Sequence, residues 1–205
     1  MFRMPTAPRQ MIKSALTGLL TFCLVLTGQI LNAQTYSWAW GKAFNTSAID
    51  EVTGAAIDNA TGATYTCGFT MGSGLFSGTS GNVSGSKDAF LIKYDAAGTQ
   101  QWAFTSGGSG DSRATGVALD VAGNIYITGW FTGTIDLNGL SLTGSGLVTS
   151  SGNVDWFVAS YTPSGMLRWR AKVGGSGEDQ PVGIAVNSTG VSVFGHVRKH
   201  SNNIA

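Results

Sequence analysis

The sequence predicts an all-β protein made of repeated antiparallel sheets, and three observations favour this. Apolar residues alternate with polar ones instead of recurring at helical spacing, glycine accounts for 30 of 205 residues, and the same order of motifs returns along the chain. Hydrophobic residues form 42% of the chain and charged residues 11%, a composition that can build a core. The balance of 12 basic and 11 acidic residues argues against nucleic-acid binding.

Residues 1–33 have the layout of a helical secretory signal peptide. Three basic residues precede an uncharged run at 15–31, and Ala33 supplies the small residue that a signal peptidase requires. We therefore expect cleavage between Ala33 and Gln34 and contact with the membrane only during export. The mature protein is then secreted or displayed on the surface of a bacterium, with the periplasm as a further possibility.

Two other interpretations of this segment stay open, an uncleaved membrane anchor over 15–31 and a lipoprotein that uses Cys23. The lipoprotein is disfavoured because bulky Phe22 stands where its signal has a small residue. After cleavage Cys67 is the one remaining cysteine, so no intramolecular disulfide can form. We expect its thiol to be a buried residue of a strand at 64–70, because no histidine or asparagine near it completes a catalytic pattern.

The mature chain repeats itself. Residues 88–120 match residues 155–187 at a constant offset of 67, including a shared tryptophan and a shared glycine-rich segment. A weaker copy begins near Trp40, where 54–68 parallels 116–129 at an offset of 61 to 62. Three copies in one chain predict three similar units of structure.

Each copy contains alternating strands joined by turns. In the segment DAFLIKYD we expect Phe90, Ile92 and Tyr94 on one face of a strand and the intervening residues on the other. The residues 95–98 and 163–165 have turn composition and precede a further strand, so each copy is predicted to contain hairpins.

The repeat of 61 to 67 residues is longer than the ~40–50 residues of familiar propeller blades, and the surplus lies in 70–87 and 132–154. We expect long loops or an extra hairpin there, with Asn138-Gly139 as its tight turn. The repeat is too long for a β-helix coil and too short for a seven-stranded sandwich. A partial β-propeller of four-stranded antiparallel blades is therefore predicted for 34–197, followed by an irregular tail over 198–205.

The motif order DAFLIKYDAAGTQQW, GGSGD and GVALDVAGNIYITGWF resembles the SBBP family of bacterial β-propeller repeats, over roughly residues 36–195. The resemblance implies several blades within a large exported protein, often with a sorting or adhesion module downstream, and no defined catalytic site. The residues that match blade positions of the family are Asp95, Gly98, Trp102, Gly107, Gly108, Asp120, Gly123, Gly129, Gly165, Trp169, Gly174, Gly175 and Gly190.

The chain departs from the family in the number of its blades. A closed propeller needs about four to eight blades, whereas this sequence contains two and a half. The third copy ends after the apolar segment 191–196. We interpret the chain as a fragment, a truncated product or a frame-shifted end of a longer protein. A ring closed by oligomerisation is the alternative.

Candidate sites for chemistry are weak, and we assign no catalytic, cofactor-binding or metal-binding residue and no cofactor. The segment GGSGED at 174–179 fits one calcium-binding β-roll motif, but such motifs occur in tandem, so a turn between blades is preferred. The turn and tryptophan of 95–102 are similar to the docking motif of quinone-dependent propeller dehydrogenases, where the tryptophan packs between blades. His196 and His200 lack a third ligand.

The predicted function is that of an exported non-catalytic scaffold whose loops bind an unknown extracellular protein or glycan. Trp130, Phe131 and Trp156 are candidate contact residues, although such aromatic residues also pack between blades. The alternatives are a propeller enzyme, either a glycan hydrolase or lyase or a quinoprotein, with its active site in blades missing from this chain, and a fragment without independent function.

Overall fold

The computed structural model describes residues 39–43, 48–71, 87–141 and 146–198. These residues are all-β, as predicted, and they hold no helix with the length and apolarity needed to cross a membrane. The expected signal peptide, its cleavage position at Ala33 and Gln34, and all but the first residue of the expected tail lie outside the described residues. Trp40–Ala205 form one compact unit.

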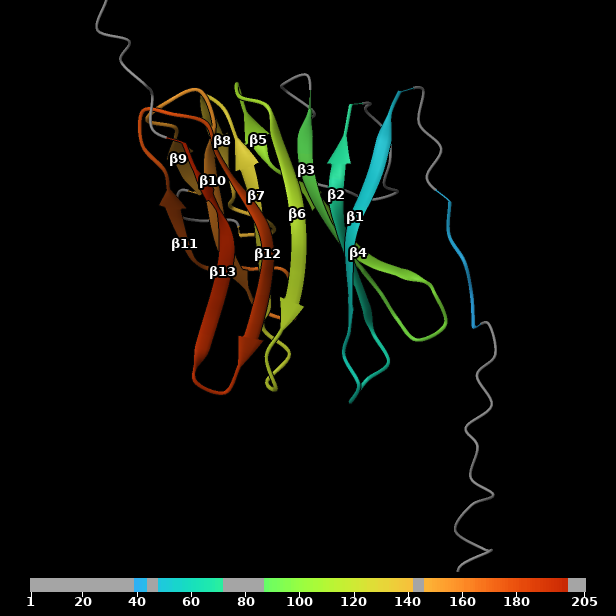
Figure 1. Ribbon diagram of the computed structural model, residues 1–205. Helices are drawn as coiled ribbons and strands as arrows, with labels where there is room; N and C mark the ends of the chain where they lie inside the picture. Colours follow the sequence, from blue (N-terminus) through green and yellow to red (C-terminus); the bar gives the residue numbers. More distant parts are fainter. Residues whose placement is uncertain (1–38, 44–47, 72–86, 142–145, 199–205) are drawn as a thin grey trace, which may run out of the picture. The chain divides into compact units, whose positions relative to one another are not determined.

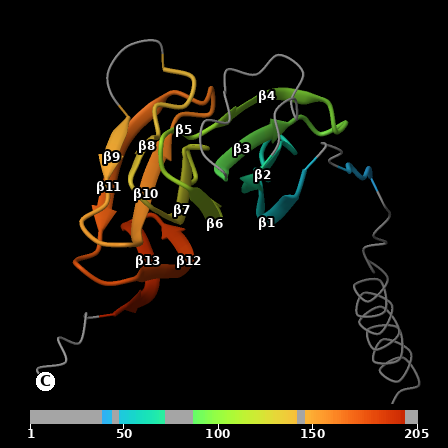
Figure 2. The same ribbon diagram turned by 90° about the horizontal axis from the view of Figure 1, so that it is seen from above.

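Two four-stranded antiparallel sheets and a pair of strands follow each other along the chain (Figures 1 and 2). The first sheet has the order β1 (Asp50–Ile57), β2 (Thr64–Thr70), β3 (Asp88–Tyr94), β4 (Gln100–Thr105). The second sheet has the order β6 (Ser112–Leu119), β7 (Ile125–Phe131), β10 (Asp155–Tyr161), β11 (Leu167–Val173). The pair consists of β12 (Asp179–Asn187) and β13 (Gly190–Val197).

The strand pairing repeats down to its irregularities. The ladder of β1 with β2 shifts between Val52 and Gly54, that of β6 with β7 between Ala114 and Gly116, and that of β12 with β13 between Pro181 and Gly183. A second shift occurs just before the tyrosine that ends β3 and again before the tyrosine that ends β10. The sequence repeat therefore corresponds to a repeat in backbone geometry, with β1, β6 and β12 as the first strands of three units.

Aspartate and glycine together shape the turns between neighbouring strands. Asp95 Oδ1 accepts hydrogen bonds from the amides of Ala97 and Thr99 at 3.0 and 2.8 Å, and Asp120 Oδ1 does the same for the amides two and four residues further on. Gly98 has a φ of 79°, a left-handed conformation that a glycine adopts without steric cost. The predicted turn at 95–98 is confirmed.

The main core lies between the first and second sheets. Leu91 and Phe104 of the first sheet pack with Phe157 and Tyr161 of the second, and the rings of Phe104 and Tyr161 are 4.9 Å apart. The opposite face of β3 carries Phe90, Ile92 and Tyr94 in a separate cluster with Ala103 and Trp40. This confirms the predicted alternation along β3. Both faces of β3 are covered, which explains why its residues 89–92 form a continuous apolar run.

A contact between a tryptophan and a turn glycine occurs twice. A Cβ on Gly98 would lie 2.7 Å from Cδ2 of Trp40, and a Cβ on Gly165 would lie 3.4 Å from Cδ2 of Trp102. Trp102 also donates a hydrogen bond from Nε1 to the carbonyl oxygen of Pro163 at 3.2 Å. The indole of one unit thus covers the β3–β4 or β10–β11 turn of the next.

The predicted tight turn at Asn138-Gly139 is present, since the amide of Ser141 donates a hydrogen bond to the carbonyl oxygen of Asn138 at 3.1 Å and Gly139 has a φ of 62°, but the strand pairing predicted across it is wrong. A small third sheet has the order β5 (Gly107–Gly108), β8 (Thr134–Asp136), β9 (Leu147–Thr149), so β8 pairs with residues well beyond the predicted turn. The amide of Leu140 instead donates a hydrogen bond to the carbonyl oxygen of Gly165 at 3.0 Å. Leu140 also packs on that glycine, so burial against the β10–β11 turn outweighs the local hairpin preference. The expected extra hairpin does exist, as β8 and β9.

Replacement of Phe157 by alanine tests the packing between the two sheets. The side chain is fully buried, so Phe157→Ala is expected to lower the free energy of unfolding by about 3–5 kcal/mol in urea denaturation. Val121 is 99% exposed in a turn, and Val121→Ala serves as the control with a change within about 0.5 kcal/mol. Equal effects of the two substitutions would contradict the described core.

Candidate functional site

The first strands β1, β6 and β12 approach one another closely because each carries a glycine directly after its ladder shift. A Cβ on Gly54 would lie 3.3 Å from the Cα of Gly116, and a Cβ on Gly116 would lie 3.2 Å from Cγ2 of Ile184. Larger residues would push the strands apart, since glycine in a strand permits close backbone approach. Figure 1 shows β6 between β1 and β12.

A cleft of about 470 Å³ lies among these three strands. We call it the first-strand cleft. The residues that line it are Glu51, Val52, Thr53, Arg113, Thr115, Trp130, Gln180 and Pro181. Carboxylate, guanidinium, amide, hydroxyl and indole groups therefore face one hollow, and every unit of the repeat contributes at least one of them.

Three of the lining residues occupy the same place in the repeat. Glu51, Arg113 and Gln180 are each the second residue of their first strand, and they stand opposite Phe69, Trp130 and His196 respectively. The chemistry at this place changes from acid to base to amide from one unit to the next. The buried framework shows the opposite behaviour, since the phenylalanine and tyrosine of β3 recur in β10.

Two of these three residues interact directly. Arg113 Nη2 forms an ion pair with Glu51 Oε1, and the guanidinium lies 5.1 Å from the ring centroid of Phe69. The side chains are 31% and 48% exposed, so the pair contributes only about 0–1 kcal/mol to stability. It holds both charged groups at the cleft while leaving them accessible to a ligand.

Thr53 ties the first and second sheets together beside the cleft. Its hydroxyl donates a hydrogen bond to the carbonyl oxygen of Ala114 in β6 at 2.7 Å. Trp130 is partly exposed in the cleft and lies opposite Arg113 in the β6–β7 ladder. The site thus combines a flat aromatic surface with hydrogen-bonding groups on a rigid backbone, an arrangement suited to binding a polar ligand.

A second cleft of similar volume lies at the turn end of the sheets, and its charged groups are already engaged. Asp95 accepts hydrogen bonds from amides of its own turn and from the side chain of Gln101. The hydroxyl of Thr61 donates a hydrogen bond to Asp58 and lowers the pKa of that carboxyl group. Lys93 Nζ donates to the carbonyl oxygen of Pro163. We favour the first-strand cleft as the functional site because all three units of the repeat contribute to it and the partly exposed indole of Trp130 lines it.

The three aromatic residues expected at a binding surface have different surroundings. Trp130 lines the first-strand cleft. Phe131 is fully buried and Trp156 is 8% exposed, so these two residues pack inside the protein, which is the alternative that the sequence left open for them. The motif analysis missed Glu51 and Gln180 because they do not match between copies. Aligning the copies and asking which exposed position varies would have found them.

The glycine-rich segment 174–179 is a turn closed by a buried aspartate. Asp179 is fully buried, Oδ2 accepts a hydrogen bond from the amide of Gly175 at 2.8 Å, and Oδ1 accepts one from the amide of Arg198 at 2.9 Å. Asp179 therefore has a structural role, since both of its carboxylate oxygens accept backbone hydrogen bonds. Within the ranges that the structure describes, no three His, Cys, Asp or Glu side chains gather closely enough to hold a metal ion. His196 lies on β13, and His200 falls outside these ranges.

Comparison of the sequence with protein-family models finds no match, and comparison with curated proteins finds no relative. The assignment of this site therefore depends on its geometry.

Cys67 is buried in β2, as predicted, and burial raises the pKa of its thiol to about 12. We expect alkylation of Cys67 at pH 8 to be at least about 100-fold slower in the native protein than in denaturant, because the unfolded thiol ionises near ~8.5. Peptide mapping by mass spectrometry separates this cysteine from Cys23. Since the folded state resists ionisation of the thiol, stability is unaffected below about pH 8.5 and falls as the pH rises toward about 12. Rapid native labelling of Cys67 would contradict its burial.

Proposed function

We propose that the protein is an exported, non-catalytic binding scaffold of the β-propeller type, and that its first-strand cleft binds an extracellular glycan. One observation carries this proposal. The equivalent position of the three units holds three different polar residues, Glu51, Arg113 and Gln180, and all three line a single cleft. A repeated framework with a varied surface at equivalent positions is what a binding scaffold requires.

The sheet geometry supports the propeller arrangement. The two four-stranded sheets have the same strand order and the same ladder shifts, and their apolar faces pack on each other. The first strands of successive units lie side by side, as they do around a propeller axis. The resemblance of residues 36–195 to SBBP repeats supports the same arrangement and an exported protein.

The chemistry of the cleft favours a glycan among extracellular ligands. Sugar rings present an apolar face that stacks on an indole, and their hydroxyl groups take part in hydrogen bonds with carboxylate, guanidinium and amide groups. Trp130 supplies the indole, and Glu51, Arg113 and Gln180 supply the polar groups.

Export can be tested independently of binding. The mature protein isolated from the outside of the producing cell is expected to begin at Gln34, because Ala33 is the small residue before the predicted cleavage position. Intact-mass measurement and N-terminal sequencing give the answer. A chain that retains residues 1–33 would contradict cleavage and favour the membrane anchor.

Substitutions in the cleft test glycan binding. Screening against defined oligosaccharides and titration calorimetry are expected to identify a ligand whose affinity falls about tenfold or more in Trp130→Ala and in Arg113→Ala, since each loses a contact that contributes ~1–2 kcal/mol. The exposed amide of Gln101 lies in the second cleft, so Gln101→Ala is the matched control and keeps full affinity.

Urea denaturation checks that the variants remain folded, with changes of about 1 kcal/mol or less for Arg113→Ala. Binding that is equally sensitive to Gln101→Ala, or an affinity unaffected by both cleft substitutions, would refute the proposed site. If no glycan binds, and a protein binds with an affinity that depends on Trp130 and Arg113, the ligand of the cleft is a protein and not a glycan.

A further inference from the structure

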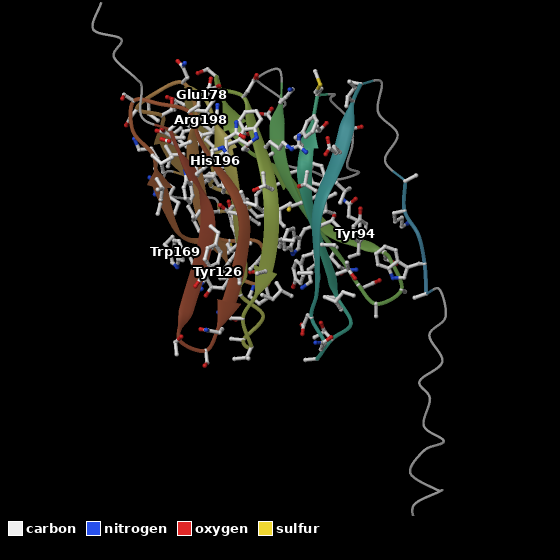
Figure 3. The ribbon with its side chains drawn as sticks, in the orientation of Figure 1. Tyr94, Tyr126, Trp169, Glu178, His196 and Arg198 are labelled. Atoms are coloured by element: carbon white, nitrogen blue, oxygen red, sulfur yellow. The ribbon has the colours of Figure 1, made fainter. Side chains whose placement is uncertain are left out.

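The far face of the second sheet carries a tryptophan whose expected cover is absent from the described residues. Trp102 of the first sheet packs on Gly165 and bonds to Pro163 in the next unit. Trp169 holds the same place in the second sheet, 67 residues later, and it is 40% exposed. It contacts Tyr126 of its own sheet, with ring centroids 6.0 Å apart (Figure 3).

The β12–β13 pair lacks, among the described residues, the third strand that both complete sheets possess. In the first sheet β3 pairs with β2 along seven residues, and in the second sheet β10 pairs with β7 along seven residues. β13 corresponds to β2 and β7, but its outer edge pairs with no described strand. Unpaired amides and carbonyl groups along this edge can accept another strand.

One side chain of β13 marks a further uncovered face, on the side of the β12–β13 pair away from the second sheet. Phe194 corresponds in the ladders to Cys67 and Thr128, since these three residues stand opposite the glycine that follows the ladder shift. Cys67 and Thr128 are fully buried, whereas Phe194 is 66% exposed. A large aromatic side chain therefore faces outward at a position that is covered in the other two units.

Phe194 and Trp169 point in the same direction but lie on the faces of two successive units. Ile184 of β12 points toward the second sheet, where it meets Gly116, and Val193 stands opposite Ile184. Because side chains alternate along a strand, Phe194 points to the other side of the β12–β13 pair. That side and the outer part of the second sheet, with Trp169, face the direction in which the next unit would stack.

We propose that the outer edge of β13 and the indole of Trp169 together bind a β-hairpin of the same kind as β3–β4 and β10–β11. Such a hairpin has an aspartate at the start of its first strand, a phenylalanine two residues later, a tyrosine at the end, and a left-handed glycine in its turn. This inference rests on the propeller-type stacking proposed above, and it is independent of the glycan.

The molecule itself shows why this occupant fits. The first strand of each hairpin pairs in register with its neighbour, so the incoming strand continues the β12–β13 ladder. Its phenylalanine and tyrosine then face back toward the second sheet, as Phe157 and Tyr161 face the first sheet. Its turn glycine meets Trp169, as Gly98 meets Trp40 and Gly165 meets Trp102. At Gly98 a Cβ would lie only 2.7 Å from the indole, and the left-handed φ of both Gly98 and Gly165 also disfavours a side chain.

The experiment uses the full chain and a synthetic peptide with the sequence of residues 155–173. Hydrogen–deuterium exchange of the full chain is measured with and without excess peptide. We expect the amides of β13, Gly190–Val197, to exchange at least about tenfold more slowly with peptide present. Trp169→Ala in the full chain is expected to weaken peptide binding about tenfold while leaving exchange in β2 of the first sheet unchanged.

Two kinds of control peptide separate strand addition from nonspecific adhesion. A peptide with valine at its turn glycine, equivalent to Gly165→Val, is expected to lose binding. Two further peptides carry N-methyl groups on alternate amides of the first strand, in complementary sets. Since the amides of a strand point alternately to its two edges, one set is expected to abolish protection of β13 and the other to retain it.

The proposal is overturned if the unmodified peptide does not protect the amides of β13 from exchange. It is also overturned if all three modified peptides still protect them. Trp169 lies outside the first-strand cleft, so glycan binding is measured on the same Trp169→Ala variant. Loss of peptide binding with intact glycan binding supports the assigned surface. Failure of the peptide with intact glycan binding refutes this inference alone.

Discussion

The contact between an indole and a turn glycine is the interaction on which the stacking of units depends. Trp40 covers Gly98 and Trp102 covers Gly165, at equivalent places in successive units. Both glycines are left-handed to close their turns, and Gly98 must also lack a side chain to admit the indole, since a Cβ there would lie 2.7 Å from Trp40. One residue therefore satisfies a local and a long-range requirement, which fixes how far each sheet lies from the next.

The first-strand cleft also depends on glycine residues, here in the first strands and not in the turns. Gly54 and Gly116 follow the ladder shifts of their strands and let neighbouring first strands come close. Glu51, Arg113 and Gln180, which precede these shifts, then line a common cleft, and their side chains stay at least partly exposed. The rigid core between Phe104 and Tyr161 supports this backbone, so polar groups in the cleft are held in place without being buried.

The sequence was sufficient for the strands, the repeat and the alternation of β3, because these depend on local patterns and on comparison of one copy with another. It predicted the turn at Asn138 but the wrong strand pairing across it, since Leu140 bonds to Gly165 of a distant turn and does not pair with β8. It also missed Glu51 and Gln180. Matching copies highlights residues that stay the same, whereas the cleft is made of residues that differ, and only the three-dimensional ladders show that they are equivalent.

The small β8–β9 insertion has a consequence for how such chains diverge. β7 and β10 pair along seven residues without a shift even though residues 132–154 leave and re-enter the sheet between them. The pairing of β7 with β10 therefore does not depend on the length of the segment between them. Lineages can lengthen, shorten or exchange this segment while the sheet beneath stays intact, and protein engineers can graft a foreign epitope there on the same grounds.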